Sequence, residues 1–176
     1  MGASLLKLPK GKPNINVSSR GVPNINIASR GLSTQIHENA NLMNCTYDNT
    51  RPFIPPITTG KVIKVYDGDT IHVACEVWKD NIYRFSVRMR GYDSAEIRTR
   101  NKAEKKAAYE AKEALENKVL GQIVRLENVA LEKYGRILAD VFFMNEHINQ
   151  WMIDNKYGIK YDGGTKIEVN WATYRK

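Results

Sequence analysis

The sequence has little cysteine, little histidine and no long apolar run, and each shortage excludes a class of protein. Two cysteines, Cys45 and Cys75, are too few for a disulfide framework or a cysteine zinc site. The three histidines are scattered and form no metal-binding motif. No segment approaches the roughly 18 apolar residues of a transmembrane helix, and the first residues lack the apolar core of a secretory signal. We therefore expect no membrane span, no signal peptide, and an intracellular or particle-associated setting.

Positive charge is in excess along the chain. Lysine and arginine number 27 against 19 aspartate and glutamate, which gives a formal net charge of +8. A basic balance favours acidic partners, with nucleic acid ahead of an anionic membrane. Plain solubility explains the same excess, so charge alone does not decide between a binding role and none.

Residues 1–57 lack any helical or strand period. Residues 11–20 and 21–30 form an imperfect ten-residue repeat centred on Pro-Asn-Ile-Asn, and two copies are too few for a solenoid. Residues 51–56 (RPFIPP) are proline-rich, which is typical of a stiff linker. The sequence predicts a disordered N-terminal arm over 1–57, with docking to a protein partner as its functional alternative, and a folded domain over 58–176.

From residue 58 onward the pattern changes to strands and helices. Alternating β-branched runs predict strands at 61–66, 70–78, 82–90, 123–127 and 137–143. Helical spacing of apolar residues predicts helices over 101–120 and 145–155. This order indicates a mainly β domain with helices (α+β). Its five strands fit an OB-type barrel, because closure hides both sheet edges.

An acidic turn, Asp67-Gly68-Asp69-Thr70, separates the first two predicted strands. The glycine lets the backbone turn sharply, and two carboxylates on such a loop suit a hard cation such as Ca²⁺. An ordinary Asp-Gly hairpin turn is the alternative.

A second charged segment follows the third predicted strand. Arg88 is followed by Asp93 and Glu96, five and eight residues further on. An arginine can donate two parallel hydrogen bonds to phosphate oxygens, one carboxylate can hold a metal, and a second can activate water. A solvated strand end with salt bridges is the alternative.

A third segment, Glu132-Lys133-Tyr134-Gly135-Arg136, opens the strand at 137–143. The turn itself is generic. It places Arg136 at a strand start, where this side chain could face Arg88.

Together, the order and spacing of these segments resemble the staphylococcal nuclease (thermonuclease) family over about residues 60–165. The resemblance implies a five-stranded OB barrel of the staphylococcal nuclease type. It also implies a calcium-dependent hydrolase, a nuclease that cleaves phosphodiester bonds of DNA, RNA or both. The alternative is the same barrel retained as a catalytically weak or inactive nucleic-acid-binding module. We assume a monomer.

The resemblance also implies roles for the acidic residues. Asp69 and Asp93 look like the calcium-binding carboxylates, with the backbone carbonyl of Ser94 as a third ligand and Asp67 in support. Glu96 looks like the general base that activates the attacking water.

The basic and aromatic residues take the substrate in the same comparison. Arg88 and Arg136 resemble the pair that clamps the phosphate and stabilises its extra charge. Lys133 and Tyr134 resemble residues that contact a terminal phosphate, and Tyr161 resembles a tyrosine that flanks the base.

The sequence departs from the family pattern at several places. Ala95 stands where the family has proline, which loosens the backbone beside the predicted base, and Tyr92 replaces an aliphatic residue. The segment between Val73 and Arg88 is longer than the family pattern, which predicts a protruding hairpin at Asp80-Asn81. The family's last long helix looks shortened or missing, and Trp171 is a candidate to fill part of the gap.

Overall fold

The computed structural model describes residues 42–165 and 167–174 and falls into two units, Met1–Arg51 and Pro52–Lys176. The ten-residue repeat and most of the predicted arm lie outside the described residues. In the first unit, residues 42–50 are exposed, and Thr46 and Asn49 exchange hydrogen bonds between side chain and backbone. All further description concerns the second unit.

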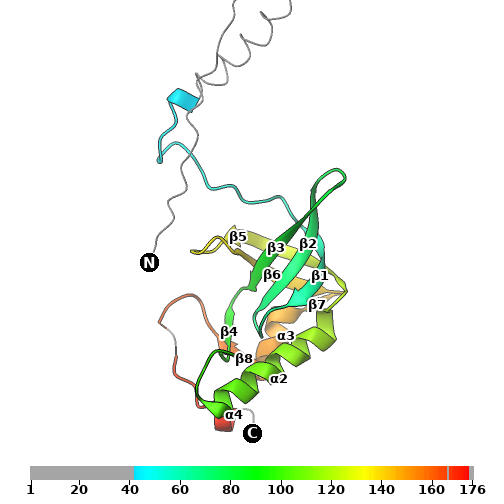
Figure 1. Ribbon diagram of the computed structural model, residues 1–176, viewed down its shortest axis with the longest axis vertical. Coiled ribbons are helices and arrows are strands. Elements are labelled where there is room, and N and C mark those ends of the chain that lie inside the picture. Colours follow the sequence, from blue (N-terminus) through cyan, green and yellow to red (C-terminus); the bar gives the residue numbers. More distant parts are fainter. Residues whose placement is uncertain (1–41, 166, 175–176) are drawn as a thin grey trace, which may run out of the picture. The chain divides into compact units, whose positions relative to one another are not determined.

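Five strands of the second unit close into a barrel (Figure 1). Antiparallel pairing joins the first three strands in chain order, and β5 pairs with both β1 and β6. Parallel pairing of β3 with β6 completes the ring, with Val87 opposite Ile137 and Arg88 opposite Leu138. The strands are β1 (Thr59–Val65), β2 (Thr70–Trp78), β3 (Asn81–Met89), β5 (Ile123–Leu131) and β6 (Ile137–Phe143). The predicted mainly β OB-type barrel with helices is therefore confirmed.

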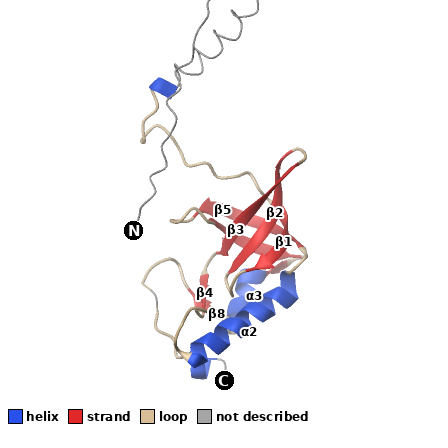
Figure 2. Cartoon of the chain, in the orientation of Figure 1, coloured by secondary structure: helices blue, strands red, loops and turns tan. Residues whose placement is uncertain are grey.

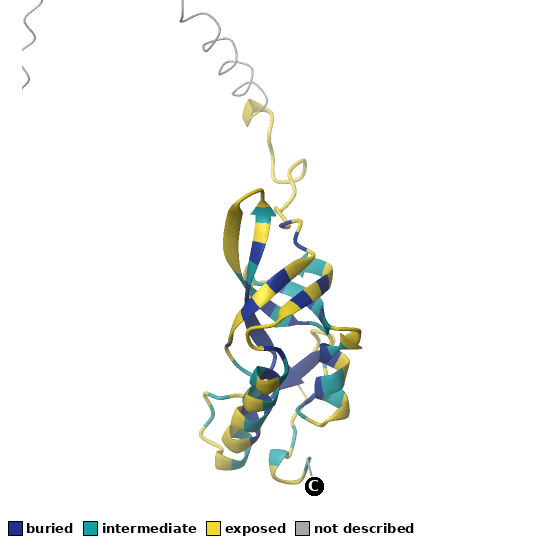
Figure 3. Ribbon diagram, turned by 90° about the vertical axis from the view of Figure 1, so that its right-hand side faces the viewer, coloured by how far each residue is buried: buried dark blue, intermediate teal, exposed yellow. Residues whose placement is uncertain are grey.

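Alternation of side chains builds the core inside this barrel. In β2, Ile71, Val73 and Cys75 are buried, whereas His72, Ala74 and Glu76 are more exposed. Figure 3 shows the alternation of buried and exposed positions along the strands. Val87 and Met89 continue the same buried face on β3. Beyond these residues the β2–β3 hairpin extends past the barrel, as its length predicts (Figure 1).

Helix α2 (Lys102–Val119) lies across the end of the barrel opposite that hairpin (Figures 1 and 2). Asn101 begins it as the N-cap: its side-chain oxygen accepts hydrogen bonds from the backbone nitrogens of Ala103 and Glu104, at 2.9 and 3.2 Å. One face is buried against the barrel and its flanking loops, and consists of Ala107, Ala108, Ala111, Leu115 and Val119. The small alanines let the helix approach the loops that carry the charged segments.

The remaining elements are short. Strands β4 (Tyr92–Ser94) and β8 (Gly158–Lys160) form a separate two-stranded sheet. The helix predicted over 145–155 begins later, as α3 (Ile148–Asp154), because β7 (Glu146–His147) instead pairs with the end of β6.

The last described element is α4 (Trp171–Tyr174). Trp171 packs against the buried cluster of Ala95, Ala107 and Ala108, so it does fill space beside α2. Among the helices that the structure describes, none has the length and apolar character needed to cross a bilayer.

Candidate functional site

The acidic turn between β1 and β2 is held tightly against its surroundings. The backbone nitrogen of Asp69 donates to the side chain of Asp67 at 3.1 Å. A Cβ atom on Gly68 would lie 2.8 Å from the Cβ atoms of both Ala111 and Ser94. Only glycine therefore lets the turn lie between α2 and β4, which positions its two carboxylates.

Asp69 is buried among hydrogen-bond donors. Its carboxylate accepts from the Thr70 hydroxyl at 2.9 Å, and from the Ser94 backbone nitrogen and hydroxyl at 3.1 and 3.2 Å. Burial opposes its charge, but the ion pair with Arg88 and these hydrogen bonds outweigh burial and lower the pKa of Asp69 below its usual value. Asp69 is therefore an ionised carboxylate.

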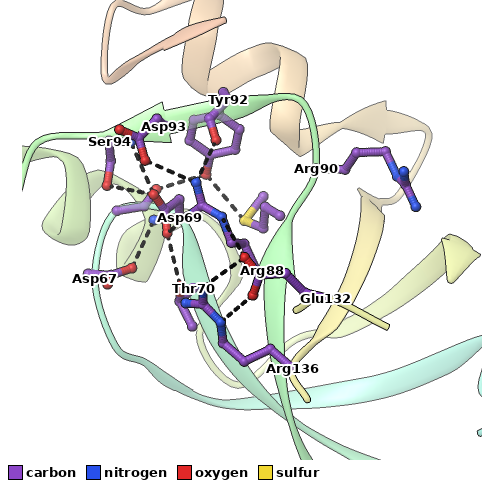
Figure 4. A network of polar contacts seen from close by, with 12 residues as sticks. Asp67, Asp69, Thr70, Arg88, Arg90, Tyr92, Asp93, Ser94, Glu132 and Arg136 are labelled. Carbon is purple, nitrogen blue, oxygen red and sulfur yellow. Dashed lines mark hydrogen bonds and ion pairs between the residues drawn. The ribbon is translucent and has the colours of Figure 1, made fainter. Parts of the chain in front are cut away.

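Arg88 connects the turn to β4 (Figure 4). Its guanidinium forms ion pairs with Asp69 and, at 3.0 Å, with Asp93, and donates to the backbone carbonyl of Tyr92 at 3.2 Å. The side chain is only 11% exposed. Burial opposes its charge, yet the two carboxylates more than compensate and raise the pKa of Arg88.

Tyr92 explains one departure from the family pattern. Its ring is fully buried, and its hydroxyl donates to the backbone carbonyl of Gly68 at 2.8 Å. Burial, followed by the negative charge of Asp69, raises the pKa of the phenol, which stays a neutral donor. A residue that stands in an aliphatic position thus anchors the acidic turn. The sequence marks the substitution but not this contact, since the two residues lie 24 positions apart.

Arg136 is held by a residue to which the sequence analysis gave no role. Its guanidinium forms two bonds with the Glu132 carboxylate, at 2.6 and 2.9 Å. The same carboxylate lies 3.8 Å from Arg88 (Figure 4). Glu132 therefore places the two guanidinium groups side by side. The sequence signal for this contact is the spacing of Glu132 and Arg136 on either side of the turn at Gly135.

Most of these side chains line one pocket of about 260 Å³. It brings together most of the predicted site, and Glu96 contributes an exposed carboxylate. Lys133 and Tyr134 stand on the exposed turn beside it and outside its lining. The lining consists of Asp67, Asp69, Arg88, Asp93, Ser94, Ala95, Glu96, Glu132, Arg136 and Tyr161.

The pKa values of the two carboxylates in the acidic turn shift in opposite directions. Burial, together with the negative charge of Asp69, raises the pKa of Asp67 to about 6. Two neighbouring carboxylates with opposite pKa shifts are a common feature of sites that handle charge or protons.

The donor set of the pocket fits a hard cation in part. The carboxylates of Asp69 and Asp93 supply oxygens of the kind that Ca²⁺ prefers. In the part of the chain that the structure describes, no three acidic, histidine or cysteine side chains group closely enough to hold a metal ion. Arg88 also contacts both carboxylates. A cation here would compete with Arg88 and would need further oxygens from the backbone or the substrate.

Comparison with known protein families finds one similarity over this part of the chain. The model of the family described as staphylococcal nuclease homologue matches residues 86–166. These residues, a little less than half of the chain, are therefore similar to that family. The match includes the predicted residues of this domain from Arg88 to Tyr161, whereas Asp67 and Asp69 precede it.

Three curated relatives resemble the nuclease-like domain. A probable endonuclease of Schizosaccharomyces pombe is 34% identical over 89 residues, which cover 47% of this chain and 39% of the relative. An uncharacterized protein of Methanocaldococcus jannaschii is 32% identical over 110 residues, 50% of each chain. An uncharacterized protein of Bacillus anthracis is 35% identical over 103 residues, 57% of this chain and 46% of the relative. The chain thus spans half or less of the length of these relatives.

Proposed function

We propose that the protein is a calcium-dependent nuclease that hydrolyses phosphodiester bonds of DNA, RNA or both. The observation that carries the proposal is the meeting of Asp69, Asp93, Glu96, Arg88 and Arg136 around one pocket. These residues come from separate segments of the chain. Solvation or salt bridging of each segment alone gives no reason for all of them to line the same small space.

The arginines would receive the phosphate. Arg88 is held at the pocket by Asp69 and Asp93, and a Ca²⁺ ion bound to these carboxylates would release its guanidinium to the phosphate oxygens. Arg136 is held by Glu132 and would share its donors with the substrate. One such preorganised donor lowers a reaction barrier by about 3 kcal/mol.

Glu96 is proposed as the general base. Its carboxylate is exposed at the pocket, where a water molecule can reach it. Accepting the proton of the attacking water accelerates hydrolysis by roughly 10²–10⁴-fold. Ca²⁺, held by Asp69, Asp93 and the Ser94 carbonyl with Asp67 in support, would supply additional positive charge to the phosphate.

A cleavage assay tests this proposal. The purified chain is incubated with single-stranded DNA and RNA in Ca²⁺, and then with a chelator. We expect cleavage only with Ca²⁺. Glu96→Gln is expected to lower the rate by about 10²–10⁴-fold, and Arg136→Ala by about 10²–10³-fold.

Arg125→Ala, an exposed arginine on β5 outside the pocket, is the matched control and should keep its activity. Circular dichroism checks that each variant is folded. Equal rates with Ca²⁺ and with the chelator would refute the calcium requirement.

The second candidate is a binding module that grips nucleic acid without cutting it. The observation that favours it is that both arginines are already paired with acidic side chains. Arg88 pairs with Asp69, and Arg136 pairs with Glu132. Tight binding without cleavage by the unmodified chain would support this candidate. Absence of both binding and cleavage would contradict both candidates.

A further inference from the structure

A second pocket adjoins the catalytic pocket. It has a volume of about 420 Å³, within the range of ligand sites, and shares Asp67 and Glu96 with its neighbour. A chain that leaves the catalytic pocket on this side therefore passes directly into the second one. No residue predicted from the sequence lies in it apart from the shared pair.

Two exposed tyrosines line the second pocket. Tyr66 follows β1 and is 44% exposed, and Tyr109 projects from α2 and is 52% exposed. The Tyr66 ring stacks on His72, with centroids 6.2 Å apart and planes at 22°. Its hydroxyl accepts a hydrogen bond from Arg98 at 3.2 Å. Tyr66 is thus an aromatic surface that is already ordered before any ligand binds.

Cationic side chains lie beside these rings, together with the shared carboxylates of Asp67 and Glu96. Lys64, Arg98 and Lys112 line the pocket, and the Lys64 ammonium lies 6.0 Å from the centre of the Tyr66 ring. Desolvation, followed by the positive charges of Lys64 and Arg84, lowers the pKa of His72, which is consistent with a positive local potential. Aromatic faces flanked by cations are the usual platform for single-stranded nucleic acid, because bases stack on the rings and phosphates pair with the charges.

We propose that this pocket, the Tyr66–Tyr109 pocket, is a nucleotide subsite. It binds the nucleotide next to the scissile phosphate on the Asp67–Glu96 side, through stacking of its base. Tyr161 lines the catalytic pocket but not the Tyr66–Tyr109 pocket. Tyr161 would therefore contact the nucleotide on the other side of the scissile phosphate. The subsite rests on the proposed nuclease function and extends it to substrate positioning.

The assignment of the subsite is tested with substrates that carry a base on just one side of the scissile phosphate. We compare a single-stranded oligonucleotide with two methyl phosphodiesters of a nucleoside, one through its 3′ oxygen and one through its 5′ oxygen. Tyr66→Ala and Tyr109→Ala should each lower kcat/KM about 5- to 100-fold for the oligonucleotide. The loss should appear mainly in KM. Only one of the two methyl esters should show this loss in kcat/KM.

Matched variants separate stacking from folding defects. Tyr66→Phe keeps the ring and loses only the hydroxyl, so it should recover most of the activity that Tyr66→Ala loses. Tyr83→Ala removes another tyrosine that is 44% exposed, outside both pockets, and should leave kcat/KM unchanged. Unchanged values for both pocket variants, or equal losses with all three substrates, would overturn the subsite.

The two proposals fail in different ways. If the unmodified chain binds nucleic acid but does not cut it, the nuclease function fails and the subsite is tested through binding. Fluorescence anisotropy of a labelled single-stranded oligonucleotide should then show a 5- to 100-fold weaker Kd for Tyr66→Ala and Tyr109→Ala. An unchanged Kd would overturn the subsite in that case too.

Discussion

Arg88 holds the two candidate calcium-binding carboxylates together through its own positive charge. It contacts Asp69 and Asp93 while it is almost completely buried. Removing one member of such a buried network leaves uncompensated charge, which commonly destabilises a protein by 3–5 kcal/mol. Loss of activity on substitution of Arg88 alone would therefore mix catalysis with folding. Less buried members of the site give clearer tests.

Asp67 gives such a test through pH. Its pKa in the folded protein is about 6, above the usual 3.8, so folding favours the protonated carboxyl. That stabilising contribution is fully present below about pH 3.8 and is lost as pH rises through about 6. Asp67→Asn, which is neutral at every pH, is expected to raise the melting temperature at pH 8 and to change it less at pH 4.5.

Thermal denaturation in a chelator measures this difference without bound metal. Asp154→Asn, at the exposed end of α3, is the charge-matched control. A lower melting temperature for Asp67→Asn at pH 8 would show that the ionised carboxylate stabilises the fold, contrary to the direction of its pKa shift.

Among the elements, strands with a clear period were the most predictable. The segments 70–78 and 137–143 have the predicted bounds because their apolar residues alternate and one face is buried. Strands β4 and β8 were missed, since three residues carry no period and their pairing joins distant segments. The start of α3 was misplaced because pairing of β7 with β6 overrides the amphipathic pattern at Glu146 and His147.

The same difference between local pattern and distant contact decides which features of the candidate site could be predicted. Arg88 and Asp93 could be found because residue type and local spacing mark them. The contacts made by Glu132 and Tyr92 could not, because they depend on how β3, β4 and β6 are brought together in three dimensions.

Helix α2 offers a prediction at the scale of one element. Asn101→Ala removes the side-chain oxygen that accepts from two backbone nitrogens at the helix start. We expect a loss of about 1 kcal/mol in the free energy of unfolding. Urea denaturation measures it, with Asn101→Asp as the control that retains a capping oxygen. A change of less than a few tenths of a kcal/mol would show that this end of α2 is secured by other contacts.

At the scale of the whole molecule, the folded domain includes the end of the segment predicted as the N-terminal arm. Ile57 is only 3% exposed and belongs to the main core. The backbone carbonyl of Thr58 accepts a hydrogen bond from Leu126 at 2.7 Å. The start of the folded domain therefore has to be defined by burial as well as by composition.

Two truncated chains test this boundary. A chain beginning at Pro52 keeps Ile57 and should melt within about 2 °C of the full chain. A chain beginning at Thr58 lacks that buried side chain and should melt about 5 °C lower or more, since deletion of a buried isoleucine costs about 2–5 kcal/mol. Equal melting temperatures for the two truncated chains would show that Ile57 contributes little.

The parallel seam between β3 and β6 has a consequence for how the molecule fails. Three residue pairs form it, and one of them includes Arg88, while Arg136 immediately precedes β6. If the seam parts, the two guanidinium groups separate even though the β2–β3 hairpin and α2 keep their local structure. The proposed phosphodiester cleavage would then disappear at a lower urea concentration than the circular dichroism signal, and loss of cleavage would report that the barrel has opened.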